Sequence, residues 1–104
     1  MTTFDGLRDK RVLVTAAGGG IGRVIARAFL DQGARVHVCD IDEAALAGFA
    51  SEAPGLGRTV ADVSDAAQVD RLFEDAAATL GGLDVLVNNA GIAGPTGPIR
   101  TVAP

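Results

Sequence analysis

Hydrophobic positions along the chain alternate between short runs and helix-spaced stripes, which predicts strands alternating with helices. Residues 11–15 (RVLVT) form an apolar run that ends in AAGGG, as expected for a buried strand followed by a tight turn. At Gly20 the spacing changes to the i, i+3, i+4 pattern of a helix, which Gly33 ends. The predicted core face of this helix consists of Ile21, Val24, Ile25, Ala28 and Phe29.

The same strand and helix pattern recurs twice, and a fourth strand follows. The further predicted strands are residues 35–39, 58–61 and 84–87. Asp42 is the predicted cap of the second helix, and either Ser64 or Asp65 caps the third, which Gly81 closes. The predicted core positions of the third helix are Val69, Leu72, Phe73, Ala76 and Leu80.

This order of elements predicts an α/β fold. Strands that alternate with helices are joined by right-handed crossovers, which give a parallel sheet with helices on both faces. We therefore expect a doubly wound, Rossmann-type sheet with strand order 3-2-1-4. Such a domain consists of two similar halves, and the predicted elements account for one of them.

Composition and charge exclude several other kinds of protein. Of the 104 residues 48% are hydrophobic and 21% are charged, which is typical of a packed globular domain. The net charge is −4 without a basic stripe, so we expect neither nucleic acid nor membrane as a partner. The single cysteine rules out an internal disulfide or a zinc cluster, and we expect no metal site. A cytoplasmic location is the resulting expectation.

Residues 15–22 (TAAGGGIG) form a glycine-rich turn between the first strand and the first helix. Glycines there let the backbone approach a ligand, and the free N–H groups of a helix N-terminus attract phosphate. A plain turn with no ligand is the alternative.

Asp40 ends the second predicted strand, 18 residues after Gly22. Its carboxylate can accept hydrogen bonds from both hydroxyls of a ribose and would repel a 2′-phosphate, which favours NAD over NADP. Gly19 and Ile41 occupy the two positions where a basic side chain could pair with that phosphate. A loop-end or capping aspartate remains the alternative interpretation of Asp40.

Together these residues resemble the short-chain dehydrogenase/reductase family. The turn is similar to the family's Thr-Gly-x-x-x-Gly-Ile-Gly pattern, Asp62-Val63 resembles its adenine-contacting pair, and residues 88–91 match its Asn-Asn-Ala-Gly segment. The resemblance implies that residues 1–104 are the N-terminal half of a single NAD(P)-binding Rossmann domain. The cofactor-binding residues that it implies are Gly18, Gly19, Gly20, Ile21, Gly22, Asp40, Ile41, Asp62, Val63, Asn88, Ala90 and Gly91.

The resemblance also implies individual roles. Gly20 would allow close packing of the helix on the strand, whereas Thr15 and Asn89 would tie the first and fourth strands together. One departure is Ala16, where the family has glycine. An alanine there costs little at negative φ but would be strained at positive φ.

Three other features look chemical, and a structural interpretation is favoured for each. His37 has no second histidine or thiolate cluster as a partner, so a packed histidine is expected. Cys39 is expected to line the core rather than to react, because the adjacent Asp40 disfavours a thiolate. Acidic residues between 62 and 75 are expected to form a solvated helix face.

The expected function is hydride transfer between NAD and an alcohol or carbonyl substrate, with NADP less favoured. The family's catalytic Tyr and Lys have no counterpart here, because the sequence has no Tyr and Lys10 precedes the first strand. We therefore expect no catalytic residue in this chain and no activity of these residues alone. The alternatives are a non-catalytic NAD-binding module and an inactive truncated fragment. A complete protein is expected to be a homo-oligomer, because an open fourth strand would otherwise remain exposed.

Overall fold

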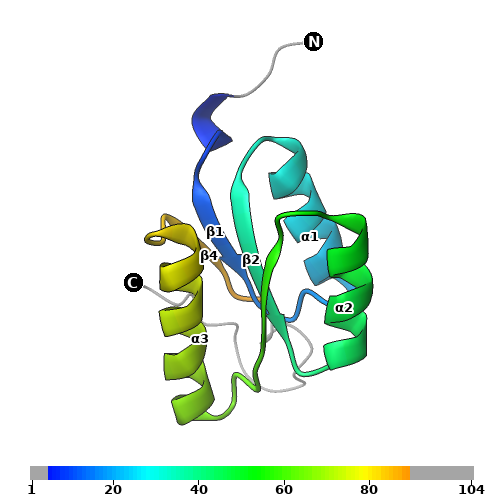
Figure 1. Cartoon of the computed structure of the whole chain (residues 1–104), viewed down its shortest axis with the longest axis vertical. Coiled ribbons are helices and arrows are strands. Elements are labelled where there is room, and N and C mark those ends of the chain that lie inside the picture. Colours follow the sequence, from blue (N-terminus) through cyan, green and yellow to red (C-terminus); the bar gives the residue numbers. More distant parts are fainter. Residues whose placement is uncertain (1–4, 90–104) are drawn as a thin grey trace.

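The computed structural model describes residues 5–89, which form one parallel sheet with helices on both faces (Figure 1). The strands are β1 (Arg11–Val14), β2 (Arg35–Asp40), β3 (Gly57–Val60) and β4 (Val85–Val87). Their order in the sheet is β3-β2-β1-β4, and every neighbouring pair is parallel. The predicted fold class and strand order are confirmed. The strand ends differ from the predicted ends by one residue, as is usual for such boundaries.

Three α-helices connect the strands. They are α1 (Gly20–Asp31), α2 (Glu43–Glu52) and α3 (Ala66–Leu80), and a 3-10 turn (Asp5–Leu7) precedes β1. Figure 1 shows α1 and α2 on one side of the sheet and α3 on the other. Each strand can pack against helices on both faces of the sheet, because successive side chains of a strand point to opposite faces.

Aspartates start two of the helices. The Asp42 carboxylate accepts a hydrogen bond from the Ala45 amide at 3.0 Å, and Asp65 accepts from the amides of Ala67 and Gln68. These bonds satisfy N–H groups that no helical carbonyl reaches. Asp65 rather than Ser64 is therefore the cap of α3. By contrast, the N-cap of α1 is Gly19, and no side chain caps this helix.

The two sides of the sheet have separate cores. Val12, Val14, Val36 and Val38 pack with α1 and α2, where Leu46 and Phe49 are fully buried. The second core, under α3, contains Leu13, Cys39, Ala61, Leu72 and Ala76. The predicted face of α3 is confirmed, because Leu72, Ala76 and Leu80 are buried and the other two positions are half-buried.

The predicted core face of α1 is wrong in part. Ile21 and Val24 are 65% and 68% exposed, and Ala28 is also exposed. The helix instead buries Gly22 and Ala26, while Ile25, Phe29 and Leu30 pack partly against the core. Small residues let the helix axis approach the sheet closely, so the helix is rotated toward them and away from two of its larger apolar side chains.

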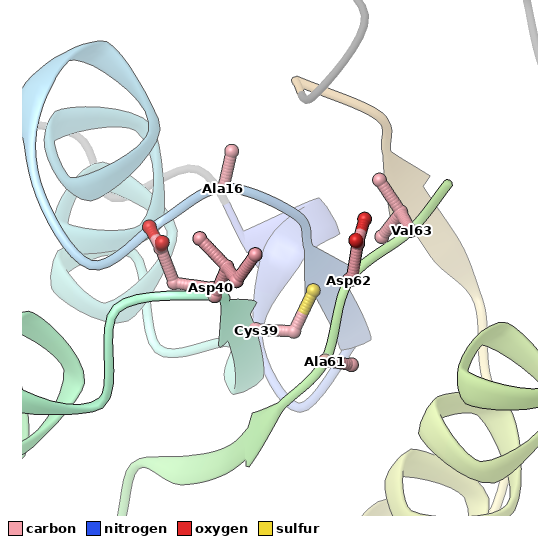
Figure 2. Close-up of a pocket in the computed structure, with 7 residues that line it drawn as sticks. Ala16, Cys39, Asp40, Ala61, Asp62 and Val63 are labelled. Carbon is pink, nitrogen blue, oxygen red and sulfur yellow. The ribbon is translucent and has the colours of Figure 1, made fainter. Parts of the chain in front are cut away.

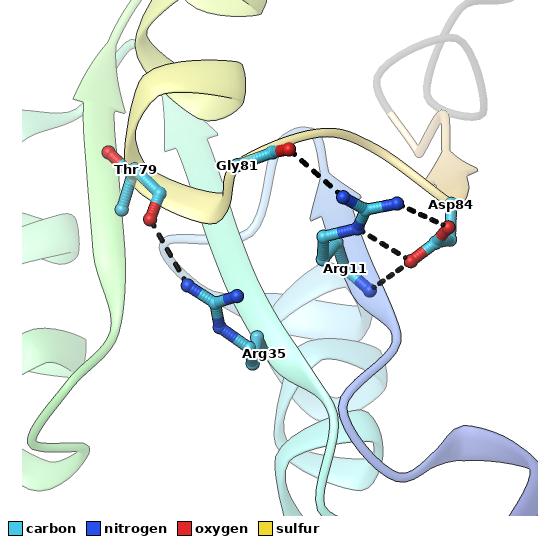
Figure 3. A network of polar contacts seen from close by, with 5 residues as sticks. All are labelled: Arg11, Arg35, Thr79, Gly81 and Asp84. Atoms are coloured by element: carbon cyan, nitrogen blue, oxygen red, sulfur yellow. Dashed lines mark hydrogen bonds and ion pairs between the residues drawn. The ribbon is translucent and has the colours of Figure 1, made fainter.

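A polar network joins the N-terminal ends of β1 and β4 (Figure 3). Arg11 donates through Nε to Oδ2 of Asp84 and through Nη2 to Oδ1, both at 2.9 Å, and through Nη1 to the Gly81 carbonyl at 2.9 Å. Its backbone amide also donates to Asp84 Oδ2. The network thus fastens the connection from α3 to β4 against the first strand.

Within residues 5–89, no helix is long and apolar enough to cross a membrane. The same residues contain no group of three or more His, Cys, Asp or Glu side chains arranged to hold a metal ion.

Candidate functional site

The turn after β1 and the ends of β2 and β3 surround a small pocket at one edge of the sheet. Its volume is about 130 Å³. The residues that line it are Ala16, Cys39, Asp40, Ile41, Ala61, Asp62 and Val63 (Figure 2). All three segments follow the carboxyl ends of parallel strands, where ligands of open α/β sheets bind. The volume is below the ~300 Å³ typical of a site for a whole drug-sized ligand, so it suits one ring of a larger molecule.

Asp40 connects the end of β2 to the glycine-rich turn. Its Oδ2 accepts a hydrogen bond from the Gly18 amide at 2.9 Å, and its Oδ1 accepts from the Asp42 amide at 3.0 Å. A carboxylate has about four lone-pair positions, so these two bonds leave acceptor capacity on both oxygens. The half-buried carboxylate can therefore hold the turn and accept further hydrogen bonds at the same time.

Asp62 borders the pocket from the segment after β3 (Figure 2). Its Oδ1 accepts from the Ser64 hydroxyl at 2.6 Å and from the Ser64 amide at 2.9 Å, and both bonds lower the pKa of Asp62. The side chain of Gln68 accepts from the Asp62 amide at 2.8 Å. Two carboxylates and no basic side chain line the pocket, so its electrostatic potential disfavours an additional anion.

The turn itself is held by close contacts between Ala16, Gly22 and Asn89. A Cβ added to Gly22 would overlap the Ala16 carbonyl oxygen, which also accepts a hydrogen bond from Asn89 Nδ2 at 3.2 Å. The expectation that Gly20 allows this close packing is wrong. A Cβ on Gly20 would meet no atom within 4 Å, and that glycine is required instead by its φ of 59°.

The N-terminus of α1 is open at this turn. Gly19 is the exposed N-cap, and the Arg23 amide makes the first helical bond to its carbonyl at 3.3 Å. The N–H groups of the first helical turn have no helical acceptor, and the helix dipole adds partial positive charge there. Ile21, on this turn, is exposed beside them. Such a terminus suits a phosphate group.

Thr15 and Asn89 have the structural role that was expected of them. The Asn89 amide donates to Thr15 Oγ1 at 2.9 Å, and the Thr15 amide donates to the Val87 carbonyl at 3.0 Å. Thr15 Oγ1 also donates to Asn88 Oδ1 at 3.1 Å. These bonds join β1 to the segment after β4. The two other implied binding residues, Ala90 and Gly91, lie outside the described residues.

Cys39 and Ala61 are pocket residues that sequence reasoning did not place in the site. Cys39 is fully buried, and burial raises the pKa of its thiol, which agrees with the expected core position. Each precedes a predicted site aspartate by one residue. That position at the end of a strand is the signal that could have identified them, because the last residues of adjacent parallel strands meet at one edge of the sheet.

Comparison with known proteins agrees with this geometry. Residues 10–103 match the family described as short chain dehydrogenase. The chain belongs to the short-chain dehydrogenase family. Members of this family are oxidoreductases with a Rossmann-type fold that use a nicotinamide cofactor, NAD or NADP.

Individual short-chain dehydrogenases are similar over most of this chain. A CoA-thioester reductase of Mycobacterium tuberculosis, (5R,7aS)-5-hydroxy-7a-methyl-1-oxo-2,3,5,6,7,7a-hexahydro-1H-indene-carboxyl-CoA reductase, is 49% identical over 98 residues, which are 88% of this chain and 37% of that protein. The crystal structure of a short-chain dehydrogenase from Mycobacterium smegmatis has a TM-score of 0.82 at 38% identity. The match covers 92% of this chain and 42% of that one.

A third similar structure, 3-ketoacyl-(acyl-carrier-protein) reductase from Brucella melitensis, was solved as a complex with NADH. Its TM-score is 0.74 at 36% identity, and the match covers 77% of this chain and 33% of the reductase. In all three comparisons this chain spans less than half the length of the short-chain dehydrogenase that it matches.

Proposed function

We propose that this chain forms the cofactor-binding half of a Rossmann domain, and that it holds NAD in preference to NADP. The observation that carries the proposal is the position of Asp40. Its carboxylate borders the pocket, keeps free acceptor positions, and is fastened to the turn through the Gly18 amide. A ribose presents two neighbouring hydroxyl donors, and a carboxylate can accept from both.

The remaining groups of the site fit the other parts of the dinucleotide. In this proposal the pyrophosphate lies against Gly18, Gly19, Gly20, Ile21 and Gly22 at the start of α1. Asp40 and Ile41 hold the adenosine ribose, Asp62 and Val63 contact the adenine, and Asn88, Ala90 and Gly91 border the second ribose. The bonds from Ser64 lower the pKa of Asp62 and so favour its charged form.

The preference for NAD follows from charge. A 2′-phosphate on the adenosine ribose would lie close to the Asp40 and Asp62 carboxylates, and no Lys or Arg lines this pocket. An unpaired phosphate beside a carboxylate is repelled at short range. Gly19 and Ile41 supply no cation at the positions where one would relieve that repulsion.

The reaction proposed for the whole protein is hydride transfer between NAD and an alcohol or carbonyl compound. When bound, the nicotinamide supplies or accepts the hydride. A group that exchanges a proton with the substrate oxygen is also required, and this sequence has no Tyr and only one Lys, Lys10, which precedes β1. We therefore propose that these 104 residues bind the cofactor without catalysing the reaction.

The binding proposal is tested by titrating NADH and NADPH into the protein and following nicotinamide fluorescence. We expect NADH to bind more tightly than NADPH. Asp40→Ala should weaken NADH binding by about tenfold or more, since hydrogen bonds to a charged group contribute about 1.5–3 kcal/mol. The matched control is Asp42→Ala, because Asp42 caps α2 without lining the pocket.

Unchanged NADH affinity in Asp40→Ala, or equal losses in the two variants, would contradict the ribose assignment. Sequence composition favours the non-catalytic module as a second candidate, because the family's catalytic Tyr has no counterpart in this chain. For the whole protein, tight NADH binding without NADH oxidation in the presence of aldehydes and ketones would support that candidate, and NADH oxidation would contradict it.

A further inference from the structure

Three hydrogen-bonded polar side chains join β2 and β3 to α3: the buried His37 and Thr59 and the exposed Asp75. His37 is 2% exposed and Thr59 is 6% exposed. The distance from His37 Nε2 to Thr59 Oγ1 is 2.7 Å, and Thr59 Oγ1 donates to Oδ2 of Asp75 at 3.1 Å. These hydrogen bonds connect β2 and β3, the two strands that lead to Asp40 and Asp62.

The directions of these hydrogen bonds determine which ring nitrogen of His37 carries the hydrogen. The Asp75 carboxylate only accepts, so it takes the single hydrogen of the Thr59 hydroxyl. Thr59 Oγ1 is then an acceptor for His37, which places the ring hydrogen on Nε2. His37 Nδ1 is left as a bare lone pair, and it has no hydrogen-bond partner within residues 5–89.

The surroundings of Nδ1 do not suit a second hydrogen. That atom faces Gly57 so closely that a Cβ added there would overlap it, and the Thr79 methyl group lies beside the same point. A proton from solvent would add to the Nδ1 lone pair and create a buried N–H without an acceptor, on a ring that also becomes charged. Both changes are costly in a protein interior.

Charged groups near the ring do not remove this cost. Charged residues of the elements packed around the ring include Asp75 and Arg71 of α3 and Arg35 of β2. Of these only Asp75 bonds to the Thr59 hydroxyl, and Thr59 separates it from the ring. Burial is the larger influence, and it lowers the pKa of His37 although Asp75 acts in the opposite direction.

We propose that His37, Thr59 and Asp75 form a proton-sensitive latch. Neutral His37 joins β2 to β3 and, through Thr59, to α3. Protonation of Nδ1 leaves the Nε2 bond to Thr59 in place but puts a charge and an unpaired N–H into the core, which favours conformations that expose the ring and loosen the strand ends around the pocket. The proposed function enters only through the identity of the ligand, NADH, that binds in the pocket. The latch itself is a property of the fold and has its own measurement.

The direction of the pH effect follows from linkage. Because the folded pKa of His37 is below its ordinary value of 6.5, the unfolded chain binds the proton more readily. The stabilisation is complete above that value and is lost as the pH falls through and below it. The unfolding constant rises by at most about tenfold for each pH unit of this fall.

Urea unfolding of the wild type and of His37→Gln at about pH 7.5 and about pH 5.5 tests the latch. The Gln amide can donate to Thr59 from the position of Nε2 but does not titrate in this range. On acidification the unfolding constant of the wild type should rise several-fold more than that of His37→Gln. Equal acid sensitivity of the two proteins would overturn the proposal.

A second measurement uses only the wild-type protein, so it does not depend on whether a variant folds. His37 is the only histidine of the sequence, so one pair of imidazole nitrogen signals reports on it by NMR. The proposal requires the hydrogen on Nε2 at neutral pH and protonation only below pH 6.5. A hydrogen on Nδ1, or protonation at or above the ordinary value, would contradict it.

NADH titrations at the same two pH values connect the latch to the pocket. We expect wild-type affinity to fall on acidification by more than that of His37→Gln. Undetectable binding at both pH values would count against the proposed cofactor and would leave the unfolding and NMR results to decide on the latch. Detectable binding with equal losses would contradict the effect on the pocket.

Discussion

Ala16 adopts a backbone conformation that its residue type disfavours. Its φ is 53°, in the left-handed region where a Cβ crowds the backbone. The conformation persists because the Ala16 carbonyl oxygen is held by the Asn89 amide group and lies against Gly22. Backbone strain of this kind persists only where contacts with the surrounding structure hold the residue in place.

Ala16→Gly should raise the free energy of unfolding by about 1 kcal/mol, because glycine adopts positive φ without the Cβ penalty. Urea unfolding measures the change. Ala17→Gly is the matched control: this neighbouring alanine is buried and has no positive φ, so its replacement should lower stability. A lower free energy of unfolding in Ala16→Gly would contradict the backbone strain that we attribute to Ala16.

Strand β4 illustrates how a short element is held in place. It has three residues, all half-buried, and pairs only with β1 among the described strands. The two-point contact between Arg11 and Asp84 precedes it, with both oxygen to nitrogen distances at 2.9 Å. Hydrogen bonds from the Arg11 side chain are the main reason that the pKa of Asp84 lies far below its usual value of 3.8.

Asp84→Asn should therefore lower stability at neutral pH and have less effect in acid. A depressed carboxyl pKa stabilises the folded state above pH 3.8, and this contribution is lost as the pH falls toward the folded pKa. Urea unfolding at about pH 7 and about pH 3 measures the difference. A double-mutant cycle with Arg11→Gln isolates the pair, and a coupling independent of pH would contradict this explanation.

At the scale of the whole molecule, an apolar stripe on α1 stays uncovered by residues 5–89. Ile21 and Val24 are each about two-thirds exposed, and one edge of β4 has no partner strand among those residues. Exposed apolar surface and an unpaired strand edge each favour association. We therefore expect the stripe to make the isolated polypeptide self-associate.

Val24→Glu should weaken self-association of the 104-residue polypeptide by about tenfold, from the loss of one buried valine contact. Analytical ultracentrifugation measures the association constant. Ala78→Glu, a change at an exposed position of α3, is the control and should have little effect. Equal constants in the two variants would place the association elsewhere on the molecule.

The sequence by itself determined the elements, their order in the sheet and most of the proposed site. Asp42, Asp65 and Gly81 act locally, because a cap or a left-handed turn depends on neighbours a few residues away. The aspartates at the ends of β2 and β3 were predictable for a related reason. Parallel strands bring their carboxyl ends to one edge, whatever the details of packing.

Only the tertiary structure decided the rotation of α1, the strain at Ala16 and the partners of His37. Helical spacing shows which residues share a face, but the close approach of Gly22 to the turn selected the face that is buried. The φ of Ala16 depends on Asn89, 73 residues away, and Thr59 meets His37 only because β2 pairs with β3. Contacts between distant segments control these features, and no local pattern in the sequence records them.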